Sequence, residues 1–173
     1  DGRDVSYRGN LVYAGDRYGA QLEHLSVGAN FNPEVGFVRR LDTKRSFAQL
    51  RFSPRPRNIR AVRKFWYTAG LTYIESFAGR VDLRQSEAEF GIEFQSADRL
   101  NIGYLDTYEY IPRPFRLTPA VSVPVGGYSY GNFYVGYNIG TQRLFAANLL
   151  AEFAELYGGT RRSLSATRGR WSP

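Results

Sequence analysis

The stretch "EAEFGIEF", Glu87 to Phe94, alternates between polar and apolar residues at every step. Its two sets are Ala88, Phe90, Ile92 and Phe94 on one side, and Glu87, Glu89, Gly91 and Glu93 on the other. Successive side chains of a β-strand point to opposite faces of the sheet. The stretch therefore predicts a strand with one apolar face and one polar face.

The same alternation recurs along the whole chain, for example in Phe65–Tyr73 and Asn132–Ile139. The segment Phe145–Phe153, "FAANLLAEF", alternates as well, although its Ala, Leu and Glu residues also favour a helix. About nine segments follow the pattern, and no convincing amphipathic helix interrupts them. The sequence therefore predicts an all-β fold.

The turns between these segments predict how the strands pair. A two-residue turn at Ala78-Gly79 sets Lys64 opposite Glu93, Trp66 opposite Gly91, Tyr67 opposite Phe90 and Phe65 opposite Ile92. Three-residue turns at Ser96–Asp98 and Thr141–Arg143 set Ile92 against Ile102 and Tyr137 against Ala147. Consecutive strands then form antiparallel hairpins, so we expect an antiparallel meander of about nine strands.

In such a meander the connections alternate between the two ends of the sheet. The two longest, Ala29–Thr43 and Pro112–Gly127, fall on the same end. Short turns at one end and longer loops at the other are typical of outer-membrane barrels. We expect the long loops to pack on the barrel mouth or on each other, with candidate mouth residues Phe31, Phe37, Arg39, Arg40, Arg113, Phe115 and Arg116.

The composition bounds the class of protein. The 173 residues suffice for one domain, 1–173. They contain no Met, not even at position 1, so we expect a processed chain or, more readily, a fragment of a longer one. They contain no Cys, which excludes disulfides and thiol chemistry. The chain carries 13 Tyr, 12 Phe and a net charge of +7. A basic, Tyr-rich chain is compatible with nucleic-acid binding, and equally with a membrane barrel that has aromatic girdles. We expect the arginine-rich segment Arg51–Lys64 to lie at a membrane boundary or to cap a turn, so nucleic acid is not a predicted partner.

The polar face of the strands predicts a hydrated lumen in which charges of opposite sign pair. The candidate lumen-facing residues are Lys64, Glu87, Glu89, Glu93 and Glu152. A solvated outer surface of a soluble barrel would carry the same residues. Strand length favours the membrane interpretation, because the strands beside Ala78-Gly79 exceed the roughly 9–11 residues that cross a bilayer.

No group of residues predicts catalysis. His24 is the only histidine, so a metal site has weak support. Paired glutamates occur in glycosidases, but on a polar strand face Glu87, Glu89 and Glu93 are better explained as lumen charges. The segment Gly158–Ser163 lacks the spacing of a phosphate-binding loop. We therefore expect a protein that is not an enzyme and that has no cofactor.

Several segments resemble one uncharacterised family of bacterial envelope proteins. They are Asn30–Arg40, Phe47–Pro56, Glu87–Leu100, Asp106–Phe115 and Val123–Tyr137. Members have an N-terminal module similar to a carbohydrate-binding module and a long C-terminal domain similar to an outer-membrane barrel. The resemblance implies that this chain is a piece of the C-terminal domain. The family has no established catalytic residues, and this chain does not end on the aromatic residue that ends many outer-membrane barrels.

Two functions follow from these patterns. The first is a section of a bacterial outer-membrane β-barrel that forms a pore or anchors a surface domain. Its partners would be membrane lipid and the remaining strands or domains of the full-length protein. The second is a soluble antiparallel β-barrel, periplasmic or secreted, that binds a glycan or an anionic ligand through its exposed Tyr and Arg residues.

Overall fold

The structure is a computed structural model that describes residues 4–32, 41–119, 121–140 and 146–169, and it is all-β. The strands are β1 (Ser6–Ala14), β2 (Tyr18–Val27), β3 (Thr43–Phe52), β4 (Val62–Glu75), β5 (Val81–Phe94), β6 (Arg99–Ile111), β7 (Phe115–Thr118), β8 (Val121–Val123), β9 (Gly126–Ile139), β10 (Ala146–Leu156) and β11 (Gly159–Gly169).

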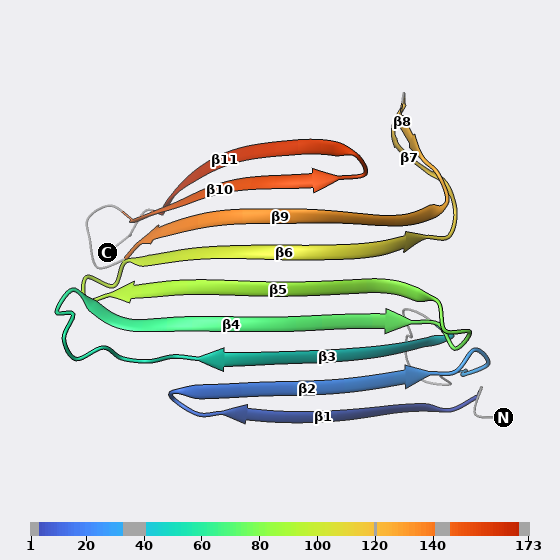
Figure 1. The fold of residues 1–173 in the computed structure, drawn as a ribbon, viewed down its shortest axis with the longest axis horizontal. Coiled ribbons are helices and arrows are strands. Elements are labelled where there is room, and N and C mark those ends of the chain that lie inside the picture. The colour runs from blue at the N-terminus through green and yellow to red at the C-terminus, as the bar shows by residue number, and fades with distance from the viewer. Residues whose placement is uncertain (1–3, 33–40, 120, 141–145, 170–173) are drawn as a thin grey trace.

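Nine of these strands form one antiparallel sheet in the order β1-β2-β3-β4-β5-β6-β9-β10-β11, and β7 and β8 form a small hairpin between β6 and β9 (Figure 1). The predicted antiparallel meander of about nine strands is confirmed. Within the described residues the sheet is open, with β1 and β11 at its two edges.

The segment whose Ala, Leu and Glu residues favour a helix forms a strand, as its alternation predicts. Residues Ala146–Leu156 form β10, which pairs with β9 on one side and with β11 on the other. Pairing on both sides satisfies the backbone groups of β10, and this tertiary context overrides the local preference.

The predicted register of β4 and β5 is confirmed. The structure pairs Lys64 with Glu93, Phe65 with Ile92, Trp66 with Gly91 and Tyr67 with Phe90. The register holds as far as Ile74 and Leu83, beyond which an irregularity widens the turn. This turn is closed by the backbone N–H of Ser76, which donates to Arg80 O over 2.9 Å.

Two other predicted registers are wrong by two residues. Ile92 lies opposite Leu100 rather than Ile102, because the turn closes between Phe94 and Asp98 and places Ala97 at a left-handed φ of 64°. Tyr137 lies opposite Leu149 rather than Ala147, and the turn between these strands falls outside the described residues. A shift of two residues keeps every side chain on its predicted face.

The connections fall at the two ends as predicted. One end, here called the short-turn end, holds the β1–β2, β3–β4, β5–β6 and β9–β10 connections (Figure 1, left). The other, the long-loop end, holds the β2–β3 connection and the β7–β8 hairpin. The predicted position of both long loops at one end is confirmed for their described residues.

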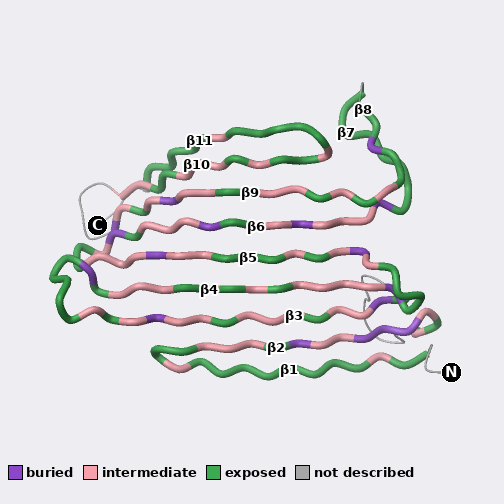
Figure 2. Tube along the Cα trace, viewed as in Figure 1, coloured by how far each residue is buried: buried purple, intermediate pink, exposed green. Residues whose placement is uncertain are grey.

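The described residues form no conventional hydrophobic core. The buried apolar residues that the structure describes are Val27, Val62, Ile111 and Val123, and they lie at strand ends or in the hairpin (Figure 2). Large apolar residues of the strands are exposed, with Leu50 60% exposed and Phe153 51% exposed. The accessible surface is 12373 Å², against about 8,600 Å² for a compact monomer of 19.7 kDa. The sheet therefore stands as a single layer.

The left-handed residue in the β5–β6 turn generates a stability prediction. Replacing Ala97 with Gly should raise the free energy of unfolding by about 1 kcal/mol, because Ala pays a steric penalty at φ 64° that Gly avoids. Chemical denaturation measures the change. The matched control, Ser96→Gly, relieves no such strain and should lower stability. Equal shifts in the two variants would contradict the described turn.

Candidate functional site

The two faces of the sheet differ in chemistry, and each is a candidate site. The apolar face is defined by Tyr13, Leu50, Tyr67, Phe90, Tyr104, Phe133 and Phe153, and the polar face by Arg8, Glu23, Arg45, Arg51, Thr68, Glu87, Glu89, Tyr134 and Glu152. The predicted separation of Ala88, Phe90, Ile92 and Phe94 from Glu87, Glu89 and Glu93 is confirmed by the strand pairing.

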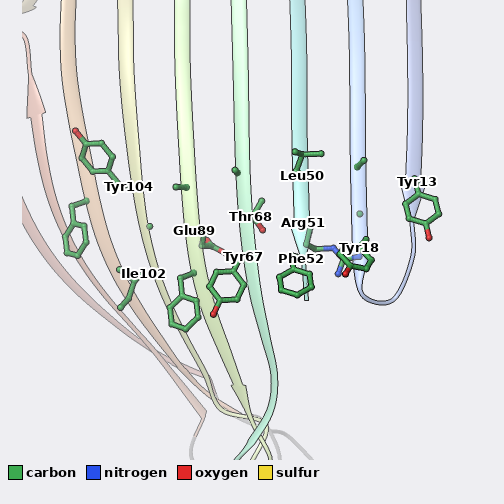
Figure 3. Close-up of a pocket in the computed structure, with 17 residues that line it drawn as sticks. Tyr13, Tyr18, Leu50, Arg51, Phe52, Tyr67, Thr68, Glu89, Ile102 and Tyr104 are labelled. Carbon is green, nitrogen blue, oxygen red and sulfur yellow. The ribbon is translucent and has the colours of Figure 1, made fainter. Parts of the chain in front are cut away.

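A row of aromatic rings crosses the apolar face near the short-turn end (Figure 3). The ring centroids lie 5.3 Å apart for Tyr18 and Phe52, 6.1 Å for Phe52 and Tyr67, and 5.0 Å for Tyr67 and Phe90. Beside this row, the small side chains of Ala69 and Ala88 leave a shallow hollow of about 740 Å³. The face around this hollow is apolar, whereas His24 and Ser46 lie on the same face farther toward the long-loop end.

The centre of the polar face is organised around Glu89. Its carboxylate accepts hydrogen bonds from Trp66 Nε1 over 2.8 Å and from the Tyr134 hydroxyl over 2.5 Å. Both rings cover glycines of the neighbouring strand, Trp66 over Gly91 and Tyr134 over Gly103. A Cβ added to Gly91 would lie 2.0 Å from the Trp66 ring, so only glycine admits this arrangement. The prediction that Trp66 covers Gly91 is confirmed.

The other predicted lumen carboxylates also have partners on the polar face. Glu87 accepts from Gln49 Nε2 over 3.2 Å, and Glu152 accepts from Arg161 over 3.3 Å and from the Ser163 hydroxyl over 3.1 Å. These contacts cross between strands, and they hold the carboxylates against the sheet. No closed lumen surrounds the described residues, so their lumen-facing role stays a prediction.

Lys64 lies opposite Glu93 but does not neutralise it. Glu93 forms its ion pairs with Arg63 at 3.1 Å and with Arg99 at 3.9 Å. A bulge between Val62 and Lys64 accounts for the contact, because it lets Arg63 turn toward the side of Glu93.

The sequence analysis missed a second charge cluster on β1–β3. The buried carboxylate of Glu23 accepts from Arg8 at 2.6 Å and from Arg45 at 3.0 Å. Two arginines thus satisfy both oxygens of one buried carboxylate, which compensates for its removal from water. Alternation places Glu23 on the polar face, so its spacing from Arg8 and Arg45 was the available signal.

An aromatic cluster ties the β7–β8 hairpin to the long-loop end. Phe115 packs against Tyr157 with centroids 5.6 Å apart, and Tyr128 and Tyr130 pack on the same ring. Glu109 accepts from the Tyr130 hydroxyl over 2.9 Å and from the Tyr157 hydroxyl over 3.1 Å. Burial, aided by the bond to Glu109, raises the pKa of Tyr157. The phenol therefore keeps its proton and remains a donor.

The candidate mouth residues have different outcomes. Phe115 packs in the cluster, as predicted, and Phe31 is half-buried at the same end. Arg113 and Arg116 are exposed. Phe37, Arg39 and Arg40 lie outside the described residues, so their placement stays a prediction.

The prediction that part of the segment Arg51–Lys64 caps a turn is confirmed for Arg51. Its guanidinium donates to Gly15 O over 2.6 Å and to Asp16 O over 3.3 Å, in the β1–β2 turn. At the same end, Asp98 accepts from the Gly140 backbone N–H over 2.9 Å, which ties the β5–β6 turn to the end of β9. Hydrogen bonds from a charged guanidinium and to a charged carboxylate thus connect neighbouring turns and strand ends at the short-turn end of the sheet.

His24 has a local structural role in the described part of the chain. Its Nδ1 lies 2.9 Å from the Ser46 hydroxyl, and its ring lies 5.8 Å from that of Tyr7. No three described His, Asp or Glu side chains come together as a metal site. In the same described residues, no helix has the length and apolarity to span a membrane.

The chain was compared with family models, with curated proteins and with solved structures, and none of the three comparisons found a match.

The contact between Trp66 and Gly91 generates the next prediction. Replacing Gly91 with Ala should lower the free energy of unfolding by about 1–3 kcal/mol, because the new methyl group displaces the Trp66 ring from Glu89. Denaturation with urea measures the loss. The matched control is Gly9→Ala, since a Cβ at Gly9 meets nothing within 4 Å. If both variants were equally stable, the described packing would be wrong.

Proposed function

We propose that the chain is a section of the wall of a bacterial outer-membrane β-barrel, with the apolar face toward lipid and the polar face toward a hydrated lumen. The observation that carries the proposal is the uncovered apolar face, which extends across the nine-stranded sheet. The module is not an enzyme. It forms part of a pore, or it anchors a surface domain.

Lipid contact offers a physical solution for the apolar face. The described part of the chain leaves side chains such as Leu50, Tyr104, Phe133 and Phe153 open on one side of a single layer. Exposure of large contiguous apolar patches to water is rare in monomeric soluble proteins. In a bilayer the same residues meet hydrocarbon, while the backbone groups between strands are already paired.

The direction of the edge strands supports the proposal that further strands complete the barrel. β1 and β11 both run from the long-loop end to the short-turn end. Nine strands alone would close with one parallel pair, so an all-antiparallel barrel needs an odd number of additional strands. Both edges keep an unbroken register and contain no proline, so neither a bulge nor a proline protects them from pairing with further strands. We propose that the remaining strands belong to the full-length envelope protein that the sequence resembles.

The polar face fits a passive role. Carboxylates such as Glu89 and Glu152 are held by donors from other strands, and Glu23 is held by two arginines. Such pairing stabilises charges on a wall and sets the field that a solute meets. Among solutes, a glycan or an anion remains the candidate, and the aromatic cluster around Tyr157 would narrow the path at the long-loop end.

A pair of charge substitutions on adjacent residues tests the membrane placement. Leu50→Arg should destabilise the protein in a bilayer by about 2–4 kcal/mol, because it puts a charge on the lipid face. The matched control, Gln49→Arg, lies on the polar face and keeps a donor for Glu87 in place of the Gln49 amide, so it should change stability by less than about 0.5 kcal/mol. Reversible unfolding from phosphatidylcholine vesicles measures both.

The outcome separates the two candidate functions. Leu50 is already 60% exposed, so in a protein that meets water on this side Leu50→Arg would cost almost nothing. A stable Leu50→Arg variant, together with a monodisperse monomer in detergent-free buffer, would overturn the membrane proposal. The soluble binding module for a glycan or an anionic ligand would then take its place.

A further inference from the structure

The apolar band crosses the strands at a slant. One row of directly opposite residues on the apolar face, here called the common row, runs through Tyr13, Ala20, Leu50, Ala69, Ala88, Tyr104, Phe133 and Phe153. On β1 the apolar positions Leu11 and Tyr7 lie on the long-loop side of this row. On β10 the next residue of this face on the long-loop side is Glu155, and the apolar positions Ala151, Leu149 and Ala147 lie on the short-turn side.

Charged residues of the same face follow the slanted border of the band on its long-loop side. Counted from the common row, Lys44 on β3 lies six residues from Leu50, and Arg84 on β5 lies four residues from Ala88. Asp106 on β6 lies two residues from Tyr104, and Glu155 on β10 lies two residues from Phe153. The border therefore approaches the short-turn end from β3 to β6, and on β10 it lies as close to the common row as on β6.

The angle of the apolar band is close to the tilt of strands in β-barrels. The apolar stretch is Tyr7–Tyr13 on β1 and Ala147–Phe153 on β10. Between β1 and β10 the apolar stretch moves by about 20 Å along the strand direction relative to the common row. The sheet extends sideways by about 34 Å between the same two strands, so the band is tilted by roughly 30°. Barrel strands tilt by about 35–45°. Each stretch is about 23 Å long, or about 20 Å along the membrane normal, close to the roughly 25 Å of a lipid-facing band.

The direction of the slant identifies the convex face. Seen from the apolar face with the short turns at the bottom, β1 lies at the right and later strands follow to the left (Figure 3). In this view the strands are vertical and the apolar band rises to the right. If the molecule is rotated until the band is horizontal, as it would be in a membrane, the strands lean to the upper right. Neighbouring strands are rotated by about −20 to −25°. When a sheet with this rotation closes into a cylinder, its strands lean to the upper right for a viewer outside the cylinder and to the upper left for a viewer inside it.

From these observations we infer that the apolar face is the convex, outer surface of the barrel and that lipid acyl chains contact it along this slanted band. The border on the short-turn side passes near Tyr13 on β1 and near Ala147 on β10. The border on the long-loop side passes near Tyr7 on β1 and near Phe153 on β10. The inference rests on the proposed membrane function, to which it adds the position and the tilt of the bilayer.

Opposite depth gradients on two strands test the inference. Nitroxide labels are placed on single cysteines at Leu11, Tyr13, Ala151 and Phe153, with the protein inserted in phosphatidylcholine vesicles. Collisions with oxygen and with a nickel chelate give the depth of each label. Leu11 should lie about 6 Å deeper than Tyr13, and Ala151 about 6 Å deeper than Phe153. Labels placed closer to the long-loop end should therefore lie deeper in the bilayer on β1 and less deep on β10. A label at Ala69, in the common row, should be deeper than those at Tyr13 and Phe153.

The possible results have distinct meanings. Equal depths along the common row, or gradients of the reverse sign, with every label still in hydrocarbon, would overturn the slanted band and leave the membrane function standing. Contact with water at all five positions would overturn the membrane function itself. If the β10 variants fail to insert, Phe133 and Val135 on β9 replace them, and Val135 should be the deeper of the two.

Discussion

A sheet one layer thick must find a partner for its apolar face, and this constraint governs the rest of the structure. The backbone groups of the inner strands are paired within the sheet, so their ladder bonds need nothing more from the surroundings. The side chains of the apolar face have no such partner in the described residues, because the buried apolar residues lie at strand ends or in the hairpin, as at Val62 and Val123. Lipid would supply the missing contact without a second layer of protein.

The polar face complements this design by neutralising charge across strands. Glu89, Glu23 and Glu152 each accept hydrogen bonds from two side chains, and most of those donors stand on neighbouring strands. Rings lie over Gly91 and Gly103 where a larger residue would push them away. These contacts specify the register and stiffen a sheet that has no core to stiffen it. The ends are fixed by Arg51 at one end and by the cluster around Tyr157 at the other.

Local patterns in the sequence predict the strands, their faces and the order of the sheet, because a period of two is a strong signal and each face has one chemistry. The pairing of Trp66 with Gly91 was also predictable, since one register aligned a charge pair and two apolar pairs. The β5–β6 register was not, because it depends on a left-handed Ala97 that no turn rule favours. The clusters around Glu23 and Tyr157 depend on long-range side-chain geometry, which alternation alone does not specify.

The central claim is that the two faces of the sheet meet different media, and neighbouring residues of β5 test it most directly. A nitroxide label at Ala88 and a label at Glu87 are compared in the membrane-inserted protein, with oxygen and a water-soluble nickel chelate as collision partners. The account predicts that the label at Ala88 meets oxygen and is shielded from nickel, while the label at Glu87 meets nickel. Equal access of nickel to both labels would contradict it.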